Sequence, residues 1–229
     1  MIFRQLFDNV SSTYTYLLGD EATGKAVIID PVIELADRDL TQIHDLGLTL
    51  SHVLDTHVHA DHVTAAAVLK NKTNALTVSS ERGALCADVK LKHGEPLQVG
   101  GITIEALATP GHTDDSLSFL VNDRVFTGDA LLVRGCGRTD FQNGDPETLY
   151  ESITKVLFTL PDATQVFPAH DYKGLTVTTI GEERRLNPRV AGKSMAEFVA
   201  IMRGLNLPPP KLIDKAVPAN RLCGNVPMG

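Results

Sequence analysis

Short runs of aliphatic and β-branched residues, bounded by polar or glycine-containing segments, recur along most of the chain. Such runs predict strands, which we place at residues 2–7, 13–18, 26–29, 50–54, 102–108, 117–121, 125–127 and 165–167. Apolar residues three or four positions apart predict helices at residues 34–46, 146–157 and 195–205. A further helix is predicted to begin within 61–69, with Asp61 at its N-terminal end, because aspartate accepts hydrogen bonds from the first N–H groups of a helix.

The strands precede the helices in each of two successive halves, and this grouping predicts two sheets packed face to face with helices outside. The chain has 229 residues, of which 43% are hydrophobic, and that is enough for one sizeable core. We therefore expect a single α/β domain over residues 1–229, with residues 206–229 as an irregular C-terminal tail packed on it.

The net charge and the composition limit the kinds of binding partner and the cell compartment that we expect. A formal net charge of −7 argues against binding to nucleic acid or to an anionic membrane. The sequence has neither an apolar run of the bilayer-spanning length of about twenty residues nor a recognisable targeting segment, so we expect a cytoplasmic protein. The three cysteines, Cys86, Cys136 and Cys223, are too few and too scattered for a disulfide framework. We expect reduced thiols, with Cys136 and Cys223 as packing residues.

Metal-competent side chains follow several of the predicted strands. The segment T-H-V-H-A-D-H contains His57, His59, Asp61 and His62 directly after a predicted strand. Three further metal-competent residues occur one at a time, each after a later strand-like run: His112, Asp129 and His170. Loops at strand ends can converge on one edge of a sheet, and imidazole and carboxylate groups bind zinc or non-haem iron. A polar surface loop that is merely rich in histidine is the plain alternative for the first segment.

Two metal sites fit these residues. In one, two metals bridged by Asp129 hold a hydroxide that attacks an acyl carbonyl. In the other, two histidines and one carboxylate hold a single Fe(II) and leave positions open for a substrate and for oxygen. The sequence spacing does not choose between them.

The separated motifs together resemble the metallo-β-lactamase superfamily. H-x-H-x-D-H at 57–62, P-G-H-T at 110–113, T-G-D at 127–129 and the late His170 occur in the order of that family. Asp30, in V-I-I-D-P, matches an early aspartate with a supporting role. The resemblance implies the αββα sandwich. The segments G-C-G-R-T-D-F-Q at 135–142 and V-P-A-N-R-L-C-G at 217–224 are similar to the persulfide dioxygenases, a branch near the glyoxalase II thioesterases.

The resemblance to that branch implies a metal and a reaction. It implies one Fe(II) per chain on His57, His112 and Asp129, with an outer shell that orients these ligands and consists of His59, Asp61, His62 and His170. It implies oxidation of glutathione persulfide by O2 to sulfite and glutathione, in the catabolism of sulfide and persulfide. The alternative is a dinuclear hydrolase of glutathione thioesters, as in glyoxalase II. A metal-free interaction module is a third class, but every ligand position of the motif is filled.

Recognition of glutathione requires groups that bind its carboxylates. Arg138 follows Asp129 and Tyr172 follows His170, and related glutathione-binding proteins have a basic residue and a tyrosine at the corresponding places. A guanidinium can bind a carboxylate through two parallel hydrogen bonds. For Arg138 a purely structural ion pair with Asp140 is an equal alternative. Tyr172 is a candidate for substrate binding and for a catalytic hydrogen bond near the iron. A homodimer and a separate sulfurtransferase that supplies the persulfide are further predictions.

Overall fold

Residues 1–225 are described by a computed structural model of the chain, in which the strands form two sheets of six strands each. The part of the predicted tail at residues 226–229 lies outside the described residues. Two compact units are distinguished along the chain. One consists of residues 1–91, 96–104 and the described residues from 209 onward, and the other of residues 92–95 and 105–208.

The first sheet has the order β1-β2-β3-β4-β5-β6. Its strands are β1 (Ile2–Asp8), β2 (Thr13–Gly19), β3 (Lys25–Ile29), β4 (Thr49–Leu54), β5 (Leu76–Ser80) and β6 (Val89–Leu91). The first three strands pair antiparallel, whereas β3 to β6 pair parallel. Parallel neighbours end at the same edge of the sheet, so the residues that follow β3 and β4 lie side by side.

The second sheet has the order β12-β11-β10-β9-β8-β7. Its strands are β12 (Thr178–Thr179), β11 (Gln165–Pro168), β10 (Arg124–Gly128), β9 (Leu117–Val121), β8 (Ile102–Ala108) and β7 (Pro96–Val99). Val121 pairs with Arg124 across a two-residue turn in which Asn122 has a φ of 53°, the conformation that tight hairpins favour. β8 and β10 both pair antiparallel with β9, and β11 pairs parallel with β10. The chain therefore runs in one direction along β8, β10 and β11.

Some of the helices begin where the sequence supplies a side-chain cap. The helices are η1 (Ile33–Leu35), α1 (Ala36–Asp45), α2 (Ala66–Thr73), α3 (Pro146–Glu151), η2 (Ser152–Val156), η3 (Leu157–Thr159), α4 (Ile180–Leu186), α5 (Met195–Arg203) and α6 (Ile213–Asn220). The Asp145 side chain accepts a hydrogen bond from the Thr148 N–H, and Pro146 occupies the first turn of α3. Ser194 and Glu197 form a reciprocal capping box at α5, which satisfies two otherwise unpaired N–H groups.

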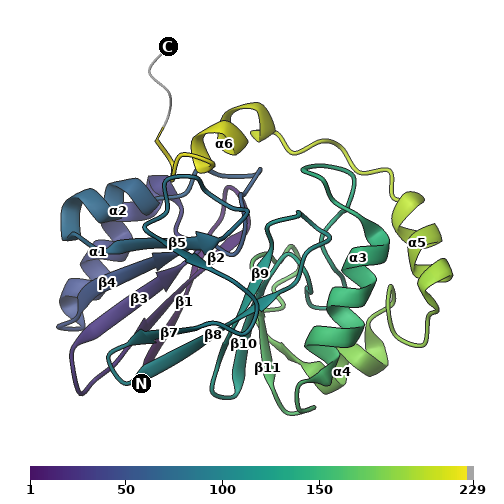
Figure 1. Ribbon diagram of the computed structural model, residues 1–229, viewed down its shortest axis with the longest axis horizontal. Coiled ribbons are helices and arrows are strands. Elements are labelled where there is room, and N and C mark those ends of the chain that lie inside the picture. Colours follow the sequence, from purple (N-terminus) through teal and green to yellow (C-terminus); the bar gives the residue numbers. More distant parts are fainter. Residues whose placement is uncertain (226–229) are drawn as a thin grey trace. The chain divides into compact units, whose positions relative to one another are not determined.

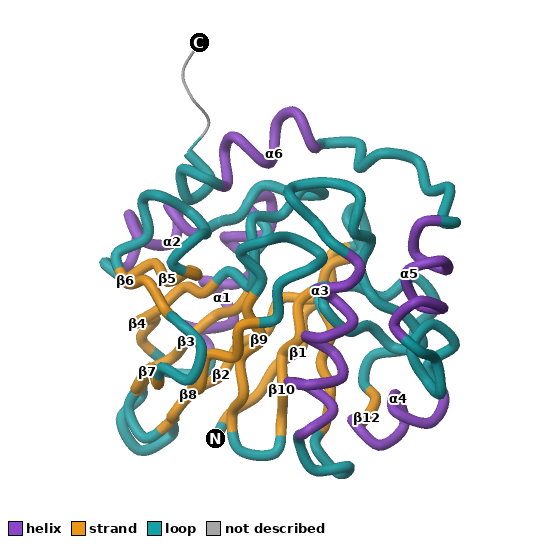
Figure 2. The backbone as a smooth tube through the Cα atoms, turned by 45° about the vertical axis from the view of Figure 1, so that its right-hand side comes forward, coloured by secondary structure: helices purple, strands orange, loops and turns teal. Residues whose placement is uncertain are grey.

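Each unit has its own apolar core. In the first unit, the helices α1 and α2 pack against the sheet beside β4 (Figure 1), and the core includes Ile43, Leu69, Ile28 and Val53. In the second unit, α3 and α5 lie side by side, as Figures 1 and 2 both show. Leu149 and Phe198 come from those two helices and join Val125 and Val166 of the sheet in a second cluster. None of the helices within residues 1–225 is long and apolar enough to cross a bilayer.

Most predicted elements are present, but the predicted helix start at Asp61 is wrong. α2 begins only at Ala66. The Asp61 carboxylate instead accepts hydrogen bonds from the Thr13 hydroxyl and from His62 Nδ1. A carboxylate engaged in this way does not cap a helix, and residues 61–64 form part of a loop.

The predicted tail also differs from the structure, because residues 213–220 form the helix α6. Pro218 lies inside this helix, and a proline at such a position normally indicates that a helix has ended. The irregular tail was predicted because residues 206–210 end the preceding helix and little regular pattern follows them. The assignment of the whole chain to a single domain stays a prediction.

The expectation that all three cysteines are reduced is wrong for two of them. Cys86 and Cys223 form a disulfide, with their Cα atoms 6.0 Å apart and a sequence separation of 137 residues. Cys136 is a free, buried thiol in the apolar cluster of the second unit, and burial raises its pKa. The disulfide was missed because nothing local in the sequence indicates a pairing over such a separation.

Candidate metal centre

Asp30 organises the start of the histidine-rich loop in the first unit. It follows β3 directly, next to the loop that follows the parallel strand β4. Its Oδ1 accepts hydrogen bonds from the Thr56 N–H at 2.7 Å and from His59 Nε2 at 3.1 Å. Its Oδ2 accepts a hydrogen bond from the Thr56 hydroxyl at 2.9 Å. One buried carboxylate thus fixes the path of the loop on both sides of His57.

The hydrogen bonds around Thr56 determine which ring nitrogen of His57 carries the proton. A carboxylate only accepts hydrogen bonds, so the Thr56 hydroxyl donates its proton to Asp30. The hydroxyl oxygen therefore accepts a hydrogen bond from Nδ1 of His57, which lies 3.0 Å away. With its proton on Nδ1, the imidazole presents the lone pair of Nε2, and metal-binding histidines are commonly oriented in this way.

The remaining metal-competent residues of this loop form a polar cluster. His59 and His62 are almost fully buried, and His62 Nδ1 donates a hydrogen bond to Asp61 Oδ2 at 2.9 Å. Burial alone would lower the pKa of His59, but the carboxylates of Asp30, Asp61 and Asp55 raise it to about 10. His59, Asp61 and His62 are close enough together to form a candidate group of metal ligands.

In the second unit, Asp129 lies between two histidines. His112, Asp129 and His170 follow β8, β10 and β11, which run in the same direction, so all three lie at one edge of the second sheet. Nε2 of His112 lies 3.5 Å from one oxygen of Asp129, and Nε2 of His170 lies 3.7 Å from the other. The prediction that strand ends bring these residues together is confirmed for these three.

His112 is oriented by the backbone that follows Asp129. Its Nδ1 donates a hydrogen bond to the carbonyl oxygen of Arg138 at 2.7 Å, so its Nε2 carries the lone pair that faces Asp129. Gly137 permits this contact, because a Cβ atom there would lie 2.7 Å from Nδ1 of His112 and 2.5 Å from the Asp129 carbonyl oxygen. Gly137 is not among the predicted site residues, although it belongs to the G-C-G-R segment.

These residues fit a metal ion. Asp129 Oδ1 is buried and accepts no hydrogen bond within the described part of the chain. A buried carboxylate oxygen that accepts no hydrogen bond is costly, and a bound cation removes that cost. His112 supplies a lone-pair nitrogen on the other side of the same carboxylate. Neutral imidazole and carboxylate suit iron and zinc alike, so the ligand set by itself indicates a metal without naming it.

The two predicted substrate residues differ in their surroundings. The Arg138 guanidinium forms two parallel hydrogen bonds with Asp140, at 2.7 and 2.8 Å, and this pairing holds the pKa of Asp140 below its usual range. This is the structural ion pair that was the alternative to a role in substrate binding. Tyr172 is 72% exposed, and its ring stacks on that of His170 with 6.0 Å between the centroids.

Comparison with known proteins identifies the class. The model of the metallo-beta-lactamase superfamily matches residues 8–84 and 88–170, which include every predicted metal-competent position. The chain therefore belongs to the metallo-β-lactamase superfamily, and the fold class predicted from the motifs is confirmed.

Relatives within the superfamily point to one branch. The mitochondrial persulfide dioxygenases ETHE1 of Homo sapiens and Bos taurus are each 49% identical over 227 residues, covering 98% of this chain and 89% of theirs. The crystal structure of ETHE1 from Myxococcus xanthus is 66% identical, with a TM-score of 0.98 over 98% of this chain and 100% of that one. These similarities confirm the resemblance to the persulfide dioxygenases.

Proposed function

We propose that this chain is an iron-dependent persulfide dioxygenase, which oxidises glutathione persulfide with O2 to sulfite and glutathione. The observation that carries the proposal is the similarity to relatives named persulfide dioxygenase over 98% of the chain. That similarity covers nearly the whole chain and not only the metal motif, which other reactions of the superfamily share. The thioesterase alternative receives less support.

The proposed ligands of the iron are His57, His112 and Asp129, the set that the resemblance to the persulfide dioxygenases implies. Two histidines and one carboxylate are the facial set of non-haem iron oxygenases. An Fe(II) ion held by these residues would supply the chemistry for oxidation of the persulfide sulfur by O2. The protein positions the reactants and shields them from water.

The chain's own contribution is the preset orientation of the ligands. Thr56 and Asp30 fix His57 with its proton on Nδ1, and the Arg138 carbonyl does the same for His112. Hydrogen bonds of this kind also raise the basicity of the imidazole. The residues proposed for the outer shell are His59, Asp61, His62 and His170.

Tyr172 is proposed to contact the substrate. Its exposed ring lies against His170, so its hydroxyl can hydrogen-bond a peptide such as glutathione without displacing core residues. For Arg138 we favour the structural pairing with Asp140 over a direct role in binding, and the homodimer and the sulfurtransferase partner stay predictions. The cytoplasmic location also stays a prediction, since the mammalian relatives are named mitochondrial.

The test combines metal analysis with a choice of substrates. Protein purified without oxygen should contain about one iron per chain, and it should produce sulfite from glutathione persulfide. S-lactoylglutathione serves as the competing substrate for the same preparation. Two tightly held zinc ions per chain, together with fast hydrolysis of S-lactoylglutathione and no sulfite, would support the thioesterase instead.

A further inference from the structure

Both ends of the Asn220 carboxamide form hydrogen bonds with the backbone of the histidine-rich loop. Asn220 ends α6 and is 2% exposed. Its Oδ1 accepts a hydrogen bond from the Thr64 N–H at 2.9 Å, and its Nδ2 donates to the carbonyls of His59 at 2.9 Å and His62 at 2.8 Å. One carboxamide thereby joins three backbone groups of a loop more than 150 residues earlier in the chain.

These contacts hold the end of the loop, as Asp30 holds its beginning. Backbone groups in a buried loop have no ladder partners and must be satisfied in another way. Asp30 satisfies the N–H of Thr56, and Asn220 satisfies groups of His59, His62 and Thr64. His57 lies between the two anchors. Asn220, which lies outside every metal motif of the sequence, thus holds the part of the loop that follows His57.

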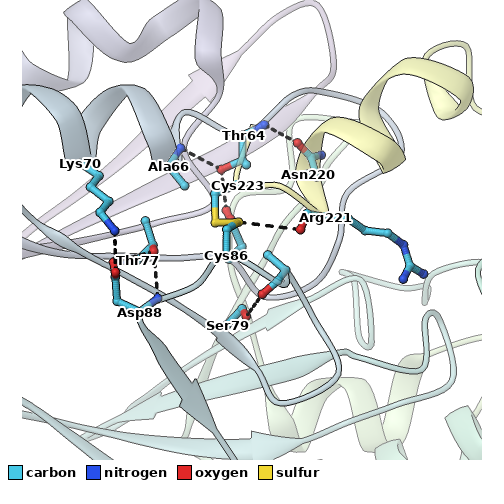
Figure 3. Close-up of a disulfide and its surroundings, with 12 residues drawn as sticks. Thr64, Ala66, Lys70, Thr77, Ser79, Cys86, Asp88, Asn220, Arg221 and Cys223 are labelled. Atoms are coloured by element: carbon cyan, nitrogen blue, oxygen red, sulfur yellow. Dashed lines mark hydrogen bonds and ion pairs between the residues drawn. A yellow bond between two sulfur atoms is a disulfide. The ribbon is translucent and has the colours of Figure 1, made fainter. Parts of the chain in front are cut away.

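A disulfide fixes the chain just beyond Asn220. Figure 3 shows Cys223 bonded to Cys86, beside the contact between Asn220 and Thr64. The Cys223 carbonyl accepts a hydrogen bond from the Ala67 N–H at 2.8 Å. A Cβ atom on Gly224, whose φ is 84°, would lie 2.1 Å from the Thr64 carbonyl oxygen. The segment 220–224 is therefore packed directly against the end of the loop.

The conformation of Cys223 indicates that its surroundings hold it in place. Its φ is 58°, in the left-handed region that residues other than glycine rarely adopt. Such a conformation costs energy and persists only where other contacts impose it. The disulfide is one such contact, and Cys86 at its other end is exposed, so a reductant in solution can reach it.

We propose that Asn220 is a positioning residue for the metal centre, and that the Cys86–Cys223 disulfide holds Asn220 against the loop. Reduction would then loosen the bound metal. The reduction breaks the sulfur–sulfur bond and adds two electrons and two protons to give two thiols. Two molecules of a thiol such as glutathione supply these and leave as their own disulfide. The inference rests on the proposed function, because it requires a metal bound by His57.

The first experiment measures how fast bound iron is lost. Protein loaded with ferrous iron without oxygen is mixed with a chelator, at a temperature below the melting temperature of each variant. Removing a hydrogen-bond partner of a metal ligand typically weakens metal binding roughly 10- to 100-fold. Asn220 acts one step further out, through the backbone of the loop, so Asn220→Ala should release iron faster by about the lower end of that range, roughly tenfold. Asn220→Asp keeps the acceptor for Thr64 but cannot donate to His59 and His62, so it should also release iron faster. The matched control is Lys215→Ala, at an exposed position of the same helix, and it should match the wild type.

The second experiment uses the wild type and needs no change at a buried position. A phosphine reductant should raise the rate of iron release from the wild type to that of Cys86→Ser, and should leave Cys86→Ser unchanged. Equal release from oxidised and reduced wild type would overturn the role of the disulfide, and release from folded Asn220→Ala at the wild-type rate would overturn the role of Asn220. If the wild type takes up no ferrous iron, the proposed function and this inference both fail.

Discussion

Replacing Arg138 with Ala should lower thermal stability and leave the KM for glutathione persulfide near the wild-type value. The guanidinium is engaged on all sides within its own unit. It pairs with Asp140, donates hydrogen bonds to the carbonyls of Pro208 at 2.6 Å and Leu207 at 3.2 Å, and lies 4.6 Å from the centre of the Phe141 ring. The two parallel donors that could bind a substrate carboxylate are thus occupied by Asp140.

The expected loss follows from these contacts. The Asp140 side chain is 55% exposed, so solvent screens the ion pair, which then contributes about 1 kcal/mol or less. Each hydrogen bond to a carbonyl contributes on the order of 1 kcal/mol, and the contact with the ring adds roughly 0.5–1 kcal/mol. A total of about 2–4 kcal/mol lowers the melting temperature of a chain of this size by roughly 5–15 °C.

The assay measures melting temperature, iron content and KM on the same preparations of wild type, Arg138→Ala and Asp140→Asn. Asp140→Asn should lower the melting temperature by a smaller amount. Iron retention should stay near the wild-type value, because the Arg138 carbonyl that orients His112 belongs to the backbone and is kept in Arg138→Ala. A roughly tenfold to hundredfold rise in KM for Arg138→Ala, with little change in melting temperature, would refute this reasoning and show that the guanidinium binds the substrate. That rise corresponds to a charge-assisted contact of about 1.5–3 kcal/mol.

Three further results are expected. His112→Ala and Asp129→Ala should each lose iron and activity, as elemental analysis and sulfite production will show; a fully loaded, active variant would exclude that residue as a ligand. Tyr172→Phe should raise KM a fewfold with normal iron content, and an unchanged KM would remove Tyr172 from the substrate site. Asp39 is buried, which raises its pKa to about 6 despite the neighbouring Arg38. Its folded pKa exceeds the unfolded value of about 3.9, so stability falls as the pH rises between those values. Denaturation curves should show that the free energy of unfolding of Asp39→Asn, relative to that of the wild type, rises by up to roughly 3 kcal/mol from pH 4 to pH 7. If the difference between the two free energies stays constant over this range, the raised pKa of Asp39 is contradicted.

The strands and the residues that follow them could be predicted because their signals are local. Runs such as 102–108 and 117–121 coincide with β8 and β9. His112, Asp129 and His170 meet because each follows a strand that runs in the same direction. For these residues, the position in the fold can be predicted from two local features: the apolar run of a strand and the polar residue that follows it.

The missed features depend on contacts that the local pattern does not encode. Asn220 reaches the loop across more than 150 residues, and Cys86 reaches Cys223 across 137. Gly137 matters because the ring of His112 approaches its backbone, and that approach exists only in the folded chain. The helix α6 contains Pro218 and shows little regular apolar pattern, so local propensity does not indicate it. In each case tertiary contacts override or add to the local signal.

The central claim is that this chain oxidises a persulfide with molecular oxygen. An oxygen electrode with glutathione persulfide as the only substrate tests it most directly, with sulfite and glutathione measured in the same sample. We expect one O2 consumed for each sulfite and each glutathione formed, because the terminal sulfur loses the four electrons that O2 takes up. Iron-loaded wild-type protein that consumes no oxygen above the background reaction of the persulfide, and forms no sulfite, would contradict the proposed function.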